Sequence, residues 1–114
     1  TSKTKNFFDT KIFNKMKKNS IFINVSRGQV VNHSSLENKK LLKKFKGIGL
    51  DVTDPEPLPK KSILNKSDNV ILTHHTAGHS DQNRNRSKKL VTDNIEKFLT
   101  RDTLLNIVDK SKEY

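Results

Sequence analysis

Residues 21–52, IFINVSRGQVVNHSSLENKKLLKKFKGIGLDV, decide the fold. Residues 21–25 are mostly apolar and β-branched and are bounded by polar residues, which predicts a strand. Residues 47–52 predict a second strand. Between them, Ser34 and Glu37 have the spacing of a capping box, and the apolar residues that follow predict one helix. A strand, a helix and a strand form a βαβ unit, which favours a parallel sheet.

The same alternation continues on both sides of this unit. Asp9 precedes apolar residues at helical spacing, and the lysines near residue 17 suit the end of a helix. The prolines within residues 54–59 predict an irregular loop. Residues 70–73, VILT, predict a third strand, and residues 80–100 predict a long polar helix with an apolar stripe. The expected fold class is therefore α/β.

The composition limits the function classes. A chain of 114 residues is long enough for one domain or part of one. Its sequence has no stretch approaching the roughly 20 apolar residues of a membrane helix, so we expect no membrane partner. The absence of cysteine excludes a disulfide framework and a thiolate metal site. We therefore expect a cytoplasmic protein without a metal centre.

The charge raises a second hypothesis, nucleic-acid binding. The 23 basic and 12 acidic side chains give a net charge of +11, and such a balance is typical of nucleic-acid-binding proteins. Lysines, however, outnumber arginines 19 to 4 and are scattered along the chain. Lysine and asparagine share A-rich codons, so a biased genome would produce the same composition. Nucleic acid is therefore the least favoured of the partners that we consider.

Polar side chains follow each predicted strand. Arg27 follows the first strand, Asp51 and then Glu56 follow the second, and His74-His75 follows the third. The carboxyl ends of parallel strands form the ligand-binding edge of such a sheet, so these groups can converge there. Arginine binds a carboxylate through two hydrogen bonds, and a histidine kept charged by a glutamate can exchange a proton with a substrate oxygen. Each residue alone is also an ordinary surface group, so spacing alone leaves the function open.

Three motifs that follow one another in the sequence narrow the choice of function. They are INVSRG at residues 23–28, GLDV at residues 49–52 with Glu56-Pro57, and THHTAG at residues 73–78. Together they resemble the D-isomer-specific 2-hydroxyacid dehydrogenases, and the resemblance extends over essentially the whole chain. The branch of glyoxylate and hydroxypyruvate reductases is the most similar. The resemblance implies the C-terminal half of a Rossmann-type doubly wound parallel sheet, with a long helix returning toward an absent substrate domain.

The resemblance also implies roles for individual residues. Arg27 takes the position of the substrate-binding arginine, His75 that of the catalytic histidine, and Glu56 that of its glutamate partner. Asp51 takes the position of the aspartate that meets the nicotinamide carboxamide. The loops implied to contact the cofactor, NAD or NADP, contribute Val25, Ser26, Arg27, His75, Thr76, Ala77 and Gly78. A small 2-oxo or 2-hydroxy acid substrate and a homodimer of the full-length protein are implied as well.

Two features depart from the family pattern. His74 stands where the family has proline, which leaves either histidine as the catalytic one, although residues 76–78 set the register in favour of His75. The phosphate-binding fingerprint G-x-G-x-x-G is absent from the sequence. We therefore expect a partial NAD(P)-binding Rossmann domain at residues 1–101, lacking the fingerprint half, and a tail at residues 102–114 that returns toward the substrate domain.

Two function hypotheses follow from the resemblance. In the first, the chain is the C-terminal portion of an NAD(P)-dependent oxidoreductase that interconverts 2-oxo acids and D-2-hydroxy acids of the glyoxylate and hydroxypyruvate type. In the second, it is a truncated, non-catalytic descendant of the family that acts as a binding scaffold. Retention of Arg27, Glu56 and His75 favours the enzyme, whereas His74 and the missing fingerprint favour the scaffold.

Overall fold

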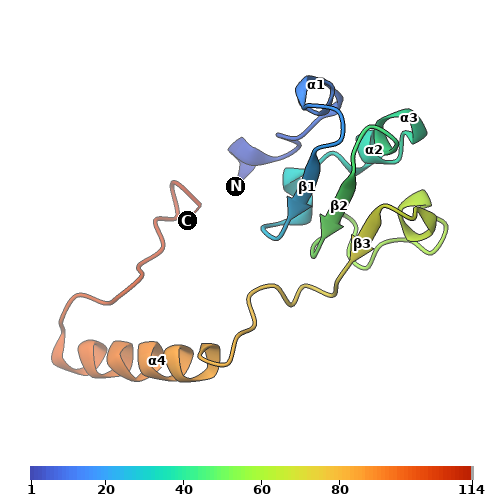
Figure 1. The fold of residues 1–114 in the computed structure, drawn as a ribbon. Coiled ribbons are helices and arrows are strands. Elements are labelled where there is room, and N and C mark those ends of the chain that lie inside the picture. The colour runs from blue at the N-terminus through green and yellow to red at the C-terminus, as the bar shows by residue number, and fades with distance from the viewer. Residues whose placement is uncertain (114) are drawn as a thin grey trace. The chain divides into compact units, whose positions relative to one another are not determined.

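A parallel sheet of three strands forms the centre of the fold (Figure 1). The computed structural model describes residues 1–113. Strands β1 (Ile21–Asn24), β2 (Gly47–Leu50) and β3 (Val70–Leu72) lie side by side in that order. Gly49 is paired with Ile23 on one side and with Ile71 on the other. The predicted α/β class and the predicted parallel pairing are confirmed.

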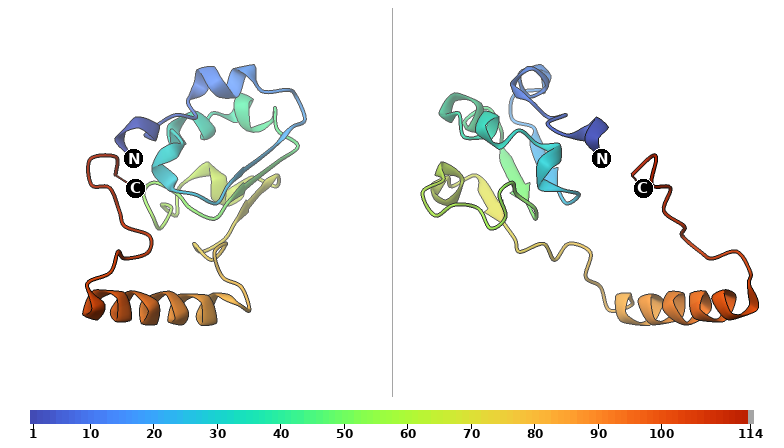
Figure 2. Two further views of the ribbon diagram at one scale, coloured as in Figure 1. Left: turned by 90° about the vertical axis from the view of Figure 1, so that its left-hand side faces the viewer. Right: turned by 180° about the vertical axis from the view of Figure 1, so that it is seen from behind.

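Three short helices cover one face of this sheet: α1 (Thr10–Lys15), α2 (His33–Leu36) and α3 (Lys39–Leu42) (Figures 1 and 2). Alternate strand residues such as Phe22 and Ile48 point toward them because side chains alternate along a strand. Three 3-10 turns complete the layer at Ser2–Thr4, Gly28–Val30 and Ile63–Lys66. The apolar core consists of Phe13, Phe22, Val31, Leu36, Leu41, Leu42, Phe45, Ile48, Leu50 and Leu64.

The N-terminal helix begins as the sequence predicts. Asp9 is the N-cap of α1, and its Oδ1 accepts a hydrogen bond from the backbone N–H of Ile12 at 2.9 Å. At the other end of α1, the ammonium group of Lys44 donates to the carbonyl oxygens of Phe13 and Asn14, both at 2.8 Å. These bonds satisfy backbone groups that have no partner within the helix.

The prediction of one helix after Ser34 is wrong, because the chain forms two helices there. Asn32, not Ser34, is the N-cap of α2, and its side chain accepts from the N–H of Ser35. Asn38 then starts α3 by accepting from the N–H groups of Lys40 and Leu41. An asparagine that bonds to the backbone in this way favours a new helix start over continuation of the old helix.

The opposite face of the sheet is open within the described part of the chain. Ile23 and Ile71 lie there with exposed fractions of 65% and 70%, and Ile21 and Val25 are similarly exposed. Gly49 lies between Ile23 and Ile71 and carries no side chain to cover them. An apolar surface of this kind is where a planar, partly apolar ligand or another segment can pack.

The chain divides into two compact units, Ser2–Ala77 and the residues from Gly78 onward. The second unit contains α4 (Asn83–Thr100), which confirms the predicted long helix. Beyond it, residues 104–108 have no regular structure, and the side chain of Asn94 exchanges two hydrogen bonds with the backbone of Leu105. The domain boundary at residue 101 stays a prediction.

A buried histidine gives the first unit a predictable dependence on pH. The side chain of His33 in α2 is only 9% exposed, and neither ring nitrogen has a partner within residues 1–113. Burial lowers the pKa of His33 from its usual 6.5, and the nearby charges of Asp54 and Glu37 offset this only in part. The unfolded chain therefore binds the proton more readily than the folded chain, so the free energy of unfolding falls as the pH drops below about 6.5.

We expect the His33→Leu variant to lose less thermal stability than the wild type between pH 8 and pH 5.5, because leucine carries no proton to bind. Melting temperatures at the two pH values measure the difference. His79→Gln is the matched control, since His79 is exposed. A His33→Leu variant that keeps the wild-type loss of stability would show that another group titrates.

Candidate active site

A buried carboxylate holds the loop that follows β3. Asp51, which comes directly after β2, is only 5% exposed. Its Oδ1 accepts from the hydroxyl of Thr73 and from the N–H of Thr76, and its Oδ2 accepts from the N–H of Ala77. The bond from the Thr73 hydroxyl is the main cause that lowers the pKa of Asp51 below 3.8, and the bond from Ala77 follows. Asp51 is therefore ionised throughout the neutral range.

This loop carries the histidine that meets a glutamate. His75 Nδ1 lies 2.9 Å from Glu56 Oε1, and the two side chains are 47% and 43% exposed. An ionised carboxylate only accepts hydrogen bonds, so Nδ1 carries a proton and Nε2 is left to face a ligand. The backbone of His75 is left-handed, with φ of 55°, and its N–H donates to the carbonyl oxygen of Asp51 at 2.8 Å. Asp51 thus fixes the backbone on which the Glu56–His75 pair depends.

The structure separates the two adjacent histidines. Within residues 1–113, Glu56 bonds to His75 and not to His74. His74 lines a pocket of about 380 Å³ whose walls also include Glu56 and Asp51, whereas His75 is not among its lining residues. Because successive side chains point in different directions, only one of the two histidines can pair with the glutamate. This geometry supports the alignment to the family motif in which His75, and not His74, is the catalytic candidate.

A second loop, after β1, presents the predicted arginine. Asn24 is buried, its Oδ1 accepts from the N–H and the hydroxyl of Ser26, and its Nδ2 donates to the carbonyl oxygen of Arg27. The guanidinium of Arg27 is exposed and donates to the carbonyl oxygen of Ser26 at 2.8 Å. Within residues 1–113 it does not contact the Glu56–His75 pair. The structure thus brings together two of the three predicted catalytic side chains.

The two loops touch through a glycine. A Cβ atom added at Gly28 would lie 1.9 Å from the carbonyl oxygen of Thr53, far inside van der Waals contact. Only glycine allows the backbone after Arg27 to approach the segment that leads to Glu56 so closely. This contact fixes the spacing between the arginine loop and the glutamate loop.

Sequence reasoning missed the two residues that shape these loops, Asn24 and Thr73. An asparagine at the end of a strand that bonds to the backbone two residues later is a known turn signal, so Asn24 could have been found. Thr73 carries no comparable signal, because its role is to bond to Asp51, 22 residues earlier in the chain.

Four of the eight predicted cofactor residues, Val25, Asp51, Thr76 and Ala77, line one pocket at the carboxyl edge of the sheet. The pocket has a volume of about 300 Å³ and is bounded by Ile23, Val25, Gly49, Leu50, Asp51, Ile71, Thr73, Thr76 and Ala77. Its walls combine exposed apolar side chains with the Asp51 carboxylate, which fits a flat ring that carries a polar amide, such as nicotinamide. Ser26, Arg27 and His75 lie in the adjoining loops, whereas Gly78 belongs to the second unit. No G-x-G-x-x-G segment is present to hold a pyrophosphate.

The family follows from a comparison of the sequence with known protein families. Residues 1–77 match the family model described as "D-isomer specific 2-hydroxyacid dehydrogenase, NAD binding domain". The chain belongs to this family. The matched region contains Arg27, Glu56 and His75, and it coincides with the first compact unit except for Thr1. The predicted nicotinamide cofactor, NAD or NADP, is confirmed at the level of this NAD-binding domain.

Curated members of the 2-hydroxyacid dehydrogenase family resemble the chain over most of its length. The human "Glyoxylate reductase/hydroxypyruvate reductase" is 36% identical over 95 residues, which cover 83% of this chain and 29% of that protein. The "Glyoxylate reductase" of Korarchaeum cryptofilum is 34% identical over 112 residues, which cover 96% of this chain and 33% of that protein. The chain thus spans about a third of the length of these relatives.

A solved structure of the same family confirms the fold. The "D-isomer specific 2-hydroxyacid dehydrogenase" of Xanthobacter autotrophicus Py2, in complex with NADPH and MES, has a TM-score of 0.89 and 29% identity. The match covers 100% of this chain and 46% of the other chain. The Rossmann-type assignment made from the motifs is therefore confirmed for the part of the domain present here. Within residues 1–113, no helix is both long enough and apolar enough to cross a bilayer.

Proposed function

We propose that this chain is the C-terminal portion of an NAD(P)-dependent oxidoreductase that interconverts 2-oxo acids and D-2-hydroxy acids of the glyoxylate and hydroxypyruvate type. The observation that carries the proposal is the Glu56–His75 pair, with its 2.9 Å hydrogen bond beside the apolar pocket at the edge of the sheet. The names of the relatives support glyoxylate and hydroxypyruvate as substrates.

In this proposal, His75 moves the proton. Its Nδ1 is bonded to Glu56, so Nε2 is the nitrogen that can donate a proton to the carbonyl oxygen of a 2-oxo acid. The negative charge of Glu56 stabilises the imidazolium before the transfer and keeps the ring oriented during it. In the reverse direction, the neutral Nε2 accepts the proton of the 2-hydroxyl group.

Arg27 binds the substrate carboxylate in this proposal. Its guanidinium is exposed and is held only by the neighbouring carbonyl of Ser26, so it can turn toward a ligand at low cost. Two parallel N–H donors match the two oxygens of a carboxylate, so the guanidinium both orients the substrate and offsets its negative charge.

Asp51, Val25, Thr76 and Ala77 hold the nicotinamide in this proposal, because they line one pocket beside His75. A reduced nicotinamide held there would supply the hydride for reduction of the 2-oxo acid. The exposed side chains of Ile23 and Ile71 provide an apolar wall that excludes water from one side of the ring.

The full-length protein is expected to reduce glyoxylate and hydroxypyruvate with NADH or NADPH at a rate on the order of 1–10³ s⁻¹, the range of ordinary enzymes. Consumption of the reduced nicotinamide, followed by its absorbance, measures the reaction. Tight binding of the nicotinamide cofactor without turnover on a panel of 2-oxo acids would instead support the non-catalytic scaffold. The homodimer and the cytoplasmic location stay predictions.

A further inference from the structure

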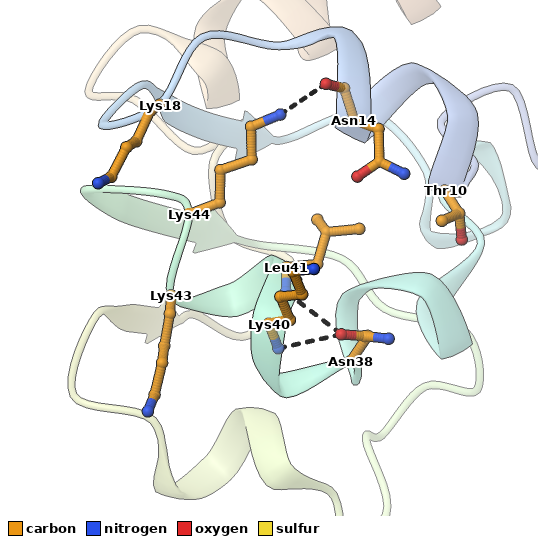
Figure 3. A pocket seen from close by; sticks show the side chains of 8 residues that line it. All are labelled: Thr10, Asn14, Lys18, Asn38, Lys40, Leu41, Lys43 and Lys44. Carbon is orange, nitrogen blue, oxygen red and sulfur yellow. Dashed lines mark hydrogen bonds between the residues drawn. The ribbon is translucent and has the colours of Figure 1, made fainter.

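A third pocket, lined by lysines, lies between α1 and α3 (Figure 3). Its volume is about 510 Å³, which falls within the roughly 300–1,000 Å³ typical of small-molecule sites. In Figure 3, the side chains of Lys18 and Lys43 extend away from Leu41, whereas Lys44 turns toward Asn14. The lining residues are Thr10, Asn14, Lys18, Asn38, Lys40, Leu41, Lys43 and Lys44.

The positive charge of this pocket is not neutralised by the protein. None of the eight lining residues is acidic. The ion pairs of His75 with Glu56, Lys89 with Asp93 and Lys112 with Asp109 include none of the lining lysines. Lys44 donates to two backbone carbonyls, but Lys18, Lys40 and Lys43 are exposed and their ammonium groups bond to no protein group in this part of the chain. Three exposed lysine side chains that line one concavity can turn toward an anion that lies in it, because their positive charges attract it.

The lysine pocket is separate from the candidate active site. Lys18 precedes β1 and Lys44 precedes β2, so the pocket lies toward the amino ends of these strands. Arg27, Glu56 and His75 follow the carboxyl ends. The lysine pocket and the pocket beside His75 share no lining residue. A ligand can therefore bind in the lysine pocket while the nicotinamide cofactor is bound in the pocket beside His75.

We propose that the lysine pocket binds a small molecule that carries two or more adjoining phosphoryl groups, such as a nucleoside triphosphate or a short inorganic polyphosphate. Lysine is a point charge that binds phosphate without a fixed geometry, so three lysines favour several negative charges close together. The side-chain amide of Asn14 adds a donor that has no partner within residues 1–113, and Leu41 adds an apolar contact. This site is independent of the proposed dehydrogenase function.

A nucleic-acid chain fits these observations less well. Binding of a single strand uses an extended basic track with aromatic side chains on which the bases stack. The lysines here line one compact, open concavity, and none of the residues that line it is aromatic. The volume and the charge therefore favour a compact anion over a polymer.

The test is a calorimetric titration of the full-length protein with tripolyphosphate, at physiological salt and with saturating NADPH so that the dinucleotide site is filled. The pocket variant combines Lys18→Gln, Lys40→Gln and Lys43→Gln and keeps Lys44, which caps α1. The control variant combines Lys60→Gln, Lys61→Gln and Lys88→Gln, which removes the same charge from exposed positions elsewhere. Circular dichroism of both variants checks that they fold.

We expect saturable binding of tripolyphosphate and of ATP, weakened at least about tenfold in the pocket variant and unchanged within about twofold in the control, since a tenfold change corresponds to a single charge-assisted contact. Equal weakening in both variants would overturn the proposal, because net charge alone would then explain the binding. Absence of saturable binding would overturn it as well. A single-stranded RNA that binds more tightly than tripolyphosphate and loses affinity in the pocket variant would reassign the surface to nucleic acid.

Discussion

Replacing His75 with alanine in the full-length protein is expected to lower kcat for glyoxylate reduction by about 10²–10⁴-fold, the usual effect of losing a general acid. Alanine cannot donate the proton to the carbonyl oxygen, and the Glu56 carboxylate 2.9 Å from the missing ring would lose its partner. The measurement is steady-state kinetics with saturating NADPH. The KM for the cofactor should change little, because the backbone that lines the cofactor pocket is retained.

His74→Ala is the matched control, since it removes the same side chain one residue away. We expect it to reduce kcat by less than about tenfold, because the ring that bonds to Glu56 is that of His75 and not that of His74. Circular dichroism of the two variants separates a chemical effect from misfolding. If His74→Ala abolishes turnover while His75→Ala retains it, the catalytic histidine is His74 and the register of the THHTAG motif is off by one residue.

The strands and the loop residues that follow them could be predicted from the sequence because they depend on local signals. Residues 21–25 and 70–73 alternate or cluster apolar side chains as strands require, and the structure differs from these boundaries by one residue. Asp9 is a strong helix start, and it caps α1 as expected. The order of Arg27, Glu56 and His75 along the chain was also readable, since residues after the ends of parallel strands share one edge.

The remaining features depend on contacts between distant residues, which no local pattern reveals. One difference has a local cause instead: the side chain of Asn38 accepts from the N–H groups of Lys40 and Leu41 and so starts a new helix there. The three hydrogen bonds of Asp51 join it to residues 22–26 positions away. The resemblance gave Asp51 a role toward the cofactor, but the sequence did not reveal that it organises the loop of His75.

Asp51→Asn is expected to lower kcat/KM for the 2-oxo acid by about 10²-fold, because it loosens the loop that carries His75. The carboxylate accepts from Thr76 N–H and Ala77 N–H through different oxygens, at 2.9 Å each. Asparagine keeps one oxygen only, so its NH2 group must face one of these N–H donors. A displacement of about 1 Å at the reacting nitrogen is enough for a loss of this size.

Thr73→Val is the control, because it removes one donor to Asp51 and leaves both acceptors of the backbone N–H groups intact. We expect a loss below about tenfold, because the N–H groups of Thr76 and Ala77 stay bonded to the two carboxylate oxygens and hold the loop in place. Stability gives a second measurement. Hydrogen bonds lower the pKa of Asp51 below 3.8, so the stability that its charge contributes is present above pH 3.8 and is lost as the pH falls through the folded-state pKa. The stability difference between wild type and Asp51→Asn should therefore be constant at neutral pH and shrink in acid. If the Asp51→Asn variant keeps the wild-type kcat/KM, the hydrogen bonds that the Asp51 carboxylate accepts from the loop do not position His75.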